Sequence, residues 1–212
     1  RLFTVENEAK FTKWLNNIVD LIDSLDKNHL VSTGSEGKNS SNDSMEIFER
    51  THKNPNIDYL TMHIWPKNWN WFKADNAEAT IPATIENAGK YIDDHIKVAE
   101  NLKRPIIIEE FGLPRENENL NAGASSVYRD KFYSYIFGRV AESVKNNGPL
   151  RAANFWGYGG EGKAIHPDGK WNPGEPFTTD PPQEPQGLNS VFNDDKSTLE
   201  IVKKYNLELK KK

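Results

Sequence analysis

The stretch PIIIEEFG, residues 105–112, joins an apolar run to two adjacent acids, an aromatic residue and a glycine. Its consecutive isoleucines are typical of a strand buried on both faces, because β-branched side chains pack well on a pleated surface. Neighbouring residues of a strand point to opposite faces, so we expect Glu109 and Glu110 to lie in different environments. One acid is then structural and the other chemical, and a chemical acid needs a partner. The alternative is that both acids are only paired with arginines.

The composition fits one sizeable globular domain whose partner is neither nucleic acid nor a membrane. The chain has 212 residues, of which 36% are hydrophobic and 11% aromatic, enough to build a core. A net charge of -4 and the lack of a basic block argue against nucleic acid and anionic membranes. There is no cysteine, which excludes disulfides and thiolate metal sites. No apolar stretch approaches the roughly 20 residues of a membrane span, so a neutral or small ligand is expected.

An amphipathic helix is predicted near the N-terminus, followed by alternating strands and helices. The apolar face of that first helix, at three-and-four spacing, comprises Phe11, Trp14, Leu15, Ile18, Leu21, Ile22 and Leu25. We expect this face to build part of the outer core. The predicted strands cover residues 30–33, 57–62, 105–112 and 150–155, and the later helices cover residues 44–52, 82–102, 125–146 and 197–205.

This order of elements implies parallel strands joined by right-handed crossovers. Two architectures are compatible with it: a small doubly wound sheet, or half of an eight-stranded barrel. In a barrel every strand delivers ligand-binding residues to one rim, whereas a doubly wound sheet concentrates them at a switch point. All four predicted strands end in unusual residues, in the segments STGSEG (32–37), MHIWPKNWNW (62–71), IEEFG (108–112) and NFWGYGG (154–160). The sequence therefore favours a (β/α)8 TIM barrel, of which this chain carries about the second half.

His63 ends the second predicted strand, with Trp65 on the same face. A lone histidine is more often a hydrogen-bonded packing residue than a ligand, and no second histidine stands at metal-binding spacing. We therefore expect no metal. At this position the His63 ring can hydrogen-bond to a hydroxylated ligand or orient a carboxylate.

Five of the six tryptophans lie at or beyond predicted strand ends, namely Trp65, Trp69, Trp71, Trp156 and Trp171. Only Trp14 lies on a helical face. Flat rings beside acids suit a sugar-binding cleft, because the apolar face of a pyranose stacks on the ring while its hydroxyls bond to polar groups. The alternative is loop packing, which we expect for Trp71 and Trp171. The long loop that follows Trp171 is rich in glycine and proline, so it is expected to be irregular and able to wall a cleft.

Five segments together resemble the endo-β-1,4-mannanases of glycoside hydrolase family 5, particularly the bacterial branch. They are HLVSTGSEG (29–37), IDYLTMHIWPKNW (57–69), RPIIIEEFG (104–112), NFWGYGGEG (154–162) and DPPQEPQGLNSVF (180–192). The resemblance covers nearly the whole chain, so residues 1–212 form one catalytic-domain segment. It implies a (β/α)8 barrel without a cofactor that cleaves β-1,4-mannosidic bonds in mannan, glucomannan or galactomannan with retention. It also implies a secreted protein, extracellular or periplasmic.

The resemblance implies roles for particular residues. The family nucleophile is the glutamate immediately before the aromatic-glycine pair, which matches Glu110 and leaves Glu109 structural. The substrate-binding positions are His63 and Trp156 around the cleaved sugar, Trp69 on a donor-side sugar, and Glu36 with Arg1 on an acceptor-side sugar. Trp65 stands where the family often has a tyrosine that touches the nucleophile. An indole can donate one hydrogen bond but cannot accept one.

The missing partner acid is expected just before residue 1. The fourth strand of the family ends in Asn-Glu-Pro-Arg, and Arg1 looks like the arginine of that motif. The acid/base glutamate and the first half of the barrel would then lie outside these residues, and the 212 residues alone are expected to be inactive. Glu8 follows an asparagine, but it enters a helix without a preceding apolar strand, so we do not assign it the role.

Two alternatives are also compatible with the sequence. The first is a related family 5 barrel that hydrolyses β-glucan or cellulose, because the shared catalytic residues do not determine the sugar. The second belongs to a different class of protein: a catalytically dead barrel domain that binds carbohydrate without cleaving it.

Overall fold

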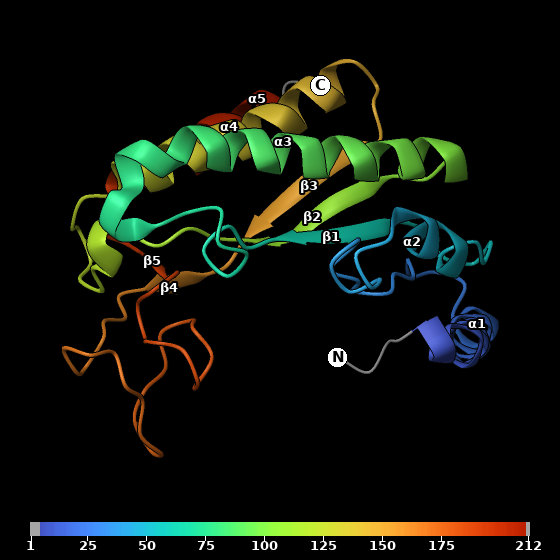
Figure 1. Cartoon of the computed structure of the whole chain (residues 1–212), viewed down its shortest axis with the longest axis horizontal. Helices are drawn as coiled ribbons and strands as arrows, with labels where there is room; N and C mark the ends of the chain where they lie inside the picture. Colours follow the sequence, from blue (N-terminus) through green and yellow to red (C-terminus); the bar gives the residue numbers. More distant parts are fainter. Residues whose placement is uncertain (1–4, 211–212) are drawn as a thin grey trace.

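The computed structural model describes residues 5–210 and centres on one parallel sheet. Its strands are β1 (Leu60–Ile64), β2 (Ile106–Phe111) and β3 (Leu150–Phe155), and they pair in chain order. Three helices cover one face of this sheet: α3 (Ala77–Leu102), α4 (Val127–Lys145) and α5 (Lys196–Leu209) (Figure 1). A doubly wound sheet would carry helices on both faces. Sequential strands with helices on one face are the arrangement of a barrel wall.

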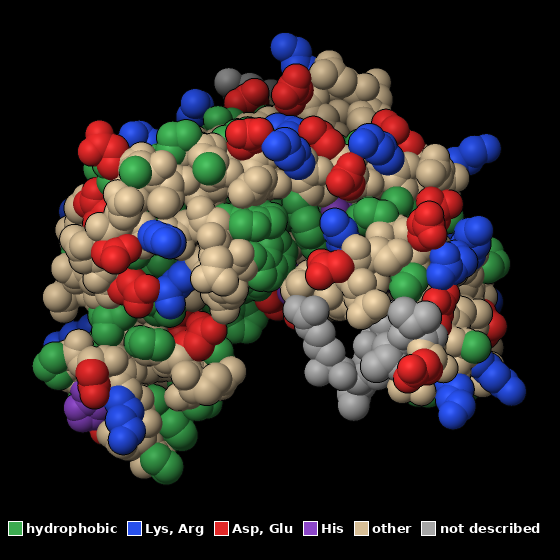
Figure 2. All heavy atoms as spheres, in the orientation of Figure 1, with side chains coloured by type: hydrophobic (Ala, Val, Ile, Leu, Met, Phe, Trp, Pro, Cys, Tyr) green, Lys and Arg blue, Asp and Glu red, His purple; other side chains and the backbone are tan. Residues whose placement is uncertain are grey.

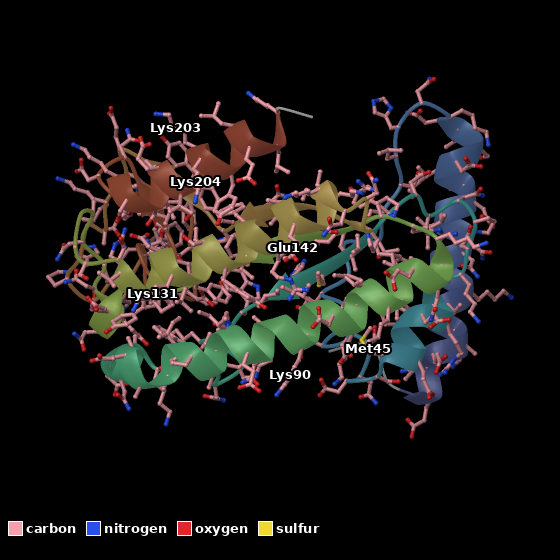
Figure 3. All side chains as sticks on the ribbon, turned by 90° about the horizontal axis from the view of Figure 1, so that it is seen from above. Met45, Lys90, Lys131, Glu142, Lys203 and Lys204 are labelled. Carbon is pink, nitrogen blue, oxygen red and sulfur yellow. The ribbon has the colours of Figure 1, made fainter. Side chains whose placement is uncertain are left out.

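The core lies between the sheet and these helices, which lie side by side in Figure 3. Ile106 and Ile108 of β2 are fully buried. Phe111, at the end of the same strand, lies edge-on to Tyr133 of α4, with 4.8 Å between ring centroids. The alternation of buried and half-buried residues along β2 shows that its other side chains point away from the helices. The helices therefore fix the sheet from one side only.

No element within residues 5–210 covers the opposite face of the sheet. Two further helices, α1 (Glu8–Leu25) and α2 (Met45–Thr51), lie beyond one end of it, and the loop after β4 (Tyr158–Gly160) hangs from the other end (Figure 1). Figure 2 shows the molecule hollowed between these two parts, with hydrophobic side chains in the hollow. β4 pairs with β5 (Val191–Phe192) in a small second sheet. Short 3-10 turns complete the elements, at Val5–Asn7, Ala74–Asn76 and Glu116–Glu118.

The apolar face of α1 is mostly exposed, so the expectation that it builds the outer core is wrong for most of its members. Leu15 and Val19 are buried. Trp14 is 57% exposed and Leu25 is 78% exposed, and the same holds to a lesser degree for Ile18, Leu21 and Ile22. Among residues 5–210, no element covers this face. The periodicity predicted the helix correctly but could not predict what packs against it.

Residues 30–33 do not form the predicted strand. Its contacts with the chain that leads into β1 are separate hydrogen bonds instead of a regular ladder. Asp58 N–H donates to the carbonyl of Val31, whose own N–H donates to the Asp58 carboxylate, at 2.9 and 2.6 Å. Further along, His63 N–H donates to the carbonyl of Glu36 at 3.2 Å. The carboxylate of Asp58 therefore takes the place of one backbone carbonyl acceptor of a regular ladder.

The other predicted elements form, with shifted ends. β3 has the predicted bounds and β2 lies within the predicted 105–112. β1 begins three residues later than predicted, because Ile57 is buried without joining the ladder. α3 begins before Pro82, the predicted start, since a proline in the second turn removes only one helical hydrogen bond. The irregular loop over residues 171–190 is confirmed.

Candidate functional site

The carboxyl ends of the three parallel strands bring the predicted site residues to one edge of the sheet. β1 ends beside His63, β2 ends at Glu110 and Phe111, and Trp156 directly follows β3. Trp156 N–H also donates to the carbonyl of Phe111 at 2.8 Å, which continues the β2–β3 pairing past the strand end. The sheet itself therefore positions these side chains.

A bulge in β2 places both glutamates on the same side. Met62 pairs with Ile108, but the next residue of β1, His63, pairs with Glu110, so Glu109 is the extra residue. A bulge lets two successive side chains leave the strand in similar directions. His63 Nε2 lies 3.1 Å from Glu109 Oε2, and its Nδ1 lies 3.1 Å from Glu110 Oε2. The expectations that the acids occupy different environments, or pair with arginines, are therefore wrong: they share one histidine ring.

The ionisation of this trio follows from its contacts. Burial by itself lowers the pKa of His63, but hydrogen bonds and ion pairing with Glu110 and Glu109 outweigh it, so the pKa is raised. The hydrogen bond from His63 is the main cause of a lowered pKa at Glu110, and burial opposes it. At neutral pH Glu110 is therefore a carboxylate, the form that a nucleophile requires.

Trp65 supplies a second hydrogen bond to Glu110, from its indole, which also lowers the pKa of this acid. The ring reaches that position because residue 112 is glycine: a Cβ there would lie 2.7 Å from the Trp65 ring. An indole can only donate, and an ionised carboxylate can only accept, so the pair is matched.

A cleft of about 510 Å³ opens in front of Glu110. Its lining includes five of the predicted site residues, namely Glu36, Trp65, Trp69, Glu110 and Trp156. His63 is not in the lining, because it lies behind Glu110 and is largely buried. Arg1 lies outside the described residues. The remaining lining residues were not predicted individually: Asn39, Asn68, Pro181, Gln183 and Glu184.

Two tryptophan rings are fixed by contacts behind them. Trp69 lies against Tyr91 and edge-on to Trp71, with centroid distances of 5.1 and 4.9 Å. Trp156 is 36% exposed, and its indole N–H donates to the carbonyl of Thr179 at 2.9 Å. Trp71 is a packing residue as expected. The cleft therefore presents flat apolar rings beside the Glu110 carboxylate.

The loop that walls the cleft is held by buried ionic groups. Asp180 is buried and accepts hydrogen bonds from the backbone N–H groups of Gly187 and Asn189, at 2.9 and 2.8 Å. Arg115, also buried, donates to the carbonyls of Gly187 and Ser190 and pairs with Asp195. The sequence signal for this wall was the DPPQEPQG segment, but nothing in it showed which side chains face the cleft.

Glu8 is engaged elsewhere. Its carboxylate pairs with Arg50 of α2 at 2.9 Å, and it does not line the cleft. Within residues 5–210, acidic residues and histidines form no group of three or more that could hold a metal ion. In the same range, no helix has both the length and the apolar character needed to cross a membrane.

The chain is similar to known glycoside hydrolases along its whole length. The family described as "GH family 5 beta-mannosidase-like" matches residues 1–212. The mannan endo-1,4-beta-mannosidase 4 of Solanum lycopersicum is 28% identical over 168 residues, which are 75% of this chain and 40% of that protein.

Solved structures agree with this similarity. The family 5 mannosidase of Rhizomucor miehei, 32% identical, superposes with a TM-score of 0.82 over 94% of this chain and 48% of its own. A variant of that mannosidase was solved in complex with mannosyl-fructose. The endo-1,4-beta-D-mannanase of Thermotoga petrophila, 19% identical with a TM-score of 0.55, shares the fold over 95% of this chain and 52% of its own.

This chain thus spans 40% of the tomato protein and 48% of the fungal one. Its sheet and helices correspond to part of the (β/α)8 barrel of these enzymes, which confirms the predicted fold. The chain therefore belongs to glycoside hydrolase family 5, among its β-mannosidase-like members.

Proposed function

We propose that the protein containing this chain is a retaining, endo-acting hydrolase of β-1,4-mannosidic bonds. The observation that carries the proposal is the environment of Glu110. This ionised carboxylate lies at a bulged strand end, accepts hydrogen bonds from His63 and Trp65, and faces a cleft lined by three tryptophans. Membership of family 5 and similarity to endo-mannosidases support it.

Glu110 would act as the nucleophile. One of its carboxylate oxygens forms a bond to the anomeric carbon, and the bond from that carbon to the leaving oxygen breaks with its electron pair. A second carboxyl group gives its proton to that oxygen, and the resulting glycosyl ester is then hydrolysed by a water that the same group deprotonates. The two carboxyls of a retaining glycosidase stand about 5–5.5 Å apart. We propose that the second one is a glutamate in the first half of the barrel.

The tryptophans would bind the sugars of the chain. We propose that Trp69 stacks on a donor-side mannose and that Trp156 borders the sugar being cleaved. His63 would act at the same sugar from its place behind the nucleophile. Glu36, whose carboxylate accepts a hydrogen bond from Asn39 at 2.7 Å, would bind an acceptor-side sugar together with Arg1. These roles are consistent with the positions of Trp69, Trp156 and Glu36 in the cleft lining.

The partners follow from the same proposal. β-Mannan or a manno-oligosaccharide would be the substrate, and the first half of the barrel would cover the open face of the sheet and the exposed face of α1. We further propose that the enzyme acts outside the cell or in the periplasm, where polysaccharides are met, and that it belongs to the bacterial branch of the family.

A second candidate is an exo-acting β-mannosidase, which removes single mannose units. Two observations favour it: the matching family is described as β-mannosidase-like, and the Rhizomucor enzyme is named a mannosidase. The two activities share the same chemistry at Glu110. They differ in whether the cleft admits the middle of a chain.

The test uses the full-length enzyme on mannan, glucomannan and soluble cellulose, with reducing-end release and viscosity measured together. We expect cleavage of both mannans with a fast fall in viscosity and oligosaccharide products. Release of mannose alone at nearly constant viscosity would show the exo-acting enzyme. Cleavage of cellulose alone would show that the enzyme is a β-glucan hydrolase. Binding of mannohexaose without cleavage of any polymer would show a dead carbohydrate-binding domain.

A further inference from the structure

Glu109 occupies a position that the proposed chemistry does not use. It is absent from the cleft lining, yet its carboxylate lies on His63 Nε2 at the same 3.1 Å that separates Glu110 from Nδ1. The side chain of His63 is 10% exposed, and those of Glu109 and Glu110 are 31% and 29% exposed. One nearly buried ring therefore connects the two acids of the bulge.

The contacts of His63 determine how many protons its two ring nitrogens carry. An ionised carboxylate only accepts hydrogen bonds, so each contact between ring nitrogen and carboxylate oxygen needs a proton on one of the two atoms. A neutral imidazole carries a single N–H and would leave one contact without a proton. With Glu110 ionised, Nδ1 must carry a proton. Nε2 carries one as well unless Glu109 is itself protonated.

No other charged side chain competes for the ring among the described residues. Glu110 and Glu109 are the charged groups that shift the pKa of His63, and both come from β2. Glu36, which precedes β1, contacts His63 through its backbone carbonyl, and its carboxylate is bonded to Asn39. The neighbouring strand β3, with the sequence LRAANF, has one charged residue, Arg151, and it is exposed.

We propose that Glu109 is a positioning residue of the reaction: it holds His63 as an imidazolium whose Nδ1–H is aimed at Glu110. The proposal rests on the proposed role of Glu110 as nucleophile. It assigns a function to the acid that sequence patterning left as purely structural.

The role would matter most after the first chemical step. When Glu110 bonds to the anomeric carbon and the leaving oxygen departs with its electron pair and the donated proton, Glu110 becomes a neutral ester. His63 then loses one of its two negative partners. Glu109 remains to keep the ring charged, so the Nδ1–H donor is in place when hydrolysis returns Glu110 to its carboxylate form.

Glu109→Gln tests this, because the amide keeps the shape and can still hydrogen-bond to Nε2 but carries no charge. In the full-length enzyme with ¹³C-labelled histidine, we expect the NMR titration midpoint of His63 to move to lower pH. We also expect kcat on mannohexaose to fall about 10-fold, the difference between a charge-assisted and a neutral hydrogen bond. KM should stay nearly constant, since Glu109 does not line the cleft.

Two further variants sharpen the test. Glu109→Asp keeps the charge and should return the His63 midpoint toward its original value, whereas Glu86→Gln, which removes an exposed carboxylate of α3, should leave it unchanged. In a His63→Gln background, Glu109→Gln should cause no further loss of kcat, because Glu109 acts through the ring.

An unchanged His63 midpoint in Glu109→Gln would overturn the inference, as would a loss of kcat that adds fully to that of His63→Gln. The midpoint is measured without substrate. An enzyme that is inactive on every β-mannan while its His63 midpoint shifts would therefore refute the proposed function and leave the Glu109–His63 coupling intact.

Discussion

Trp65 shows how one side chain can tune the proposed nucleophile. His63 is the main cause of the lowered pKa of Glu110, and the indole of Trp65 adds to it. Trp65→Phe removes that donor, so the pKa of Glu110 should rise and the acid should become protonated at higher pH. We therefore predict that the acid limb of the pH dependence of kcat/KM moves to higher pH, since the reactive carboxylate is lost earlier as pH falls.

Trp71→Phe is the matched control, because Trp71 packs behind Trp69 and is absent from the cleft lining. Its acid limb should coincide with that of the original enzyme. An acid limb that does not move in Trp65→Phe would show that the indole bond does not set the ionisation of Glu110.

The two cleft tryptophans should give different kinetic effects. Trp156 follows β3, beside the position that we propose for the reacting sugar, so Trp156→Ala should raise KM and lower kcat together. Trp69 lies against Tyr91 and lines the cleft, where we propose that it stacks on a donor-side sugar. Trp69→Ala should therefore mainly weaken binding, by about 1 kcal/mol or roughly fivefold for a lost stacking platform. Calorimetric titration of mannohexaose into a catalytically inactive background measures this. Equal affinities with and without the Trp69 ring would show that Trp69 only packs within its loop.

Sequence identified Glu110 as a candidate but not the way that Glu109 is used. The sequence of β2, IIIEEF, is compatible with a regular strand, in which successive side chains point to opposite faces. The bulge arises from how β2 pairs with β1, between residues more than 40 positions apart. The tryptophans were found because their ring type suits a cleft. Asn39 and Gln183 were missed because the sequence around a polar loop residue does not indicate where its side chain points.

Two buried histidines connect the loop around Gly37 to the helices. The Lys38 N–H donates to His95 Nε2 at 2.9 Å, so the other ring nitrogen carries the proton that bonds to the carbonyl of Tyr91. His52 likewise bonds to the carbonyl of Phe48 and to Thr33. Burial is the main cause that lowers the pKa of each histidine to about 4.

These values predict a loss of stability in mild acid. Unfolded histidine titrates near pH 6.5, so between pH 6.5 and 4 the unfolded chain binds more protons than the folded one. The contribution of His52 and His95 is fully present above pH 6.5 and is lost as pH falls toward 4, by about 3 kcal/mol each. Urea unfolding of the full-length enzyme at pH 7 and pH 4.5 measures this loss. His95→Gln should reduce the difference between the two pH values, and an unaltered difference would exclude His95 as a cause.

β2 was predicted well because its isoleucines form an apolar run, which leaves few alternatives to a buried strand. β3 also has the predicted bounds, although Leu150 is the one buried residue among its six. The segment 30–33 has a similar composition but depends on neighbours for its ladder, so its state could not be predicted locally. The same holds for α1: its helix is encoded by spacing, whereas the burial of its apolar face depends on elements outside it.

Among residues 5–210, one side of the sheet stays uncovered (Figure 2), and most of the apolar face of α1 is exposed. Exposed patches of this kind promote association. We therefore predict that the 212-residue chain alone self-associates in sedimentation experiments. Leu21→Lys, on the exposed face of α1, should reduce this association, because it places a charge in the patch.

In the full-length enzyme the same substitution should lower the unfolding temperature, because Leu21 would there be covered by the first half of the barrel. Lys10→Glu, a charge change at an exposed residue of the same helix, is the control for both measurements. A full-length enzyme that tolerates Leu21→Lys without loss of stability would contradict the proposed docking of the two halves.

We propose that Glu110 attacks the sugar from within this half of the barrel. The most direct measurement is to trap the glycosyl-enzyme in the full-length protein with a 2-deoxy-2-fluoro-mannosyl fluoride, and to locate the label by peptide mass spectrometry. We predict one mannosyl adduct on the peptide that contains residues 105–112, assigned by fragmentation to Glu110 and absent in Glu110→Gln. An adduct on Glu109 or Glu8, or hydrolysis that proceeds without any adduct and with inversion, would contradict it.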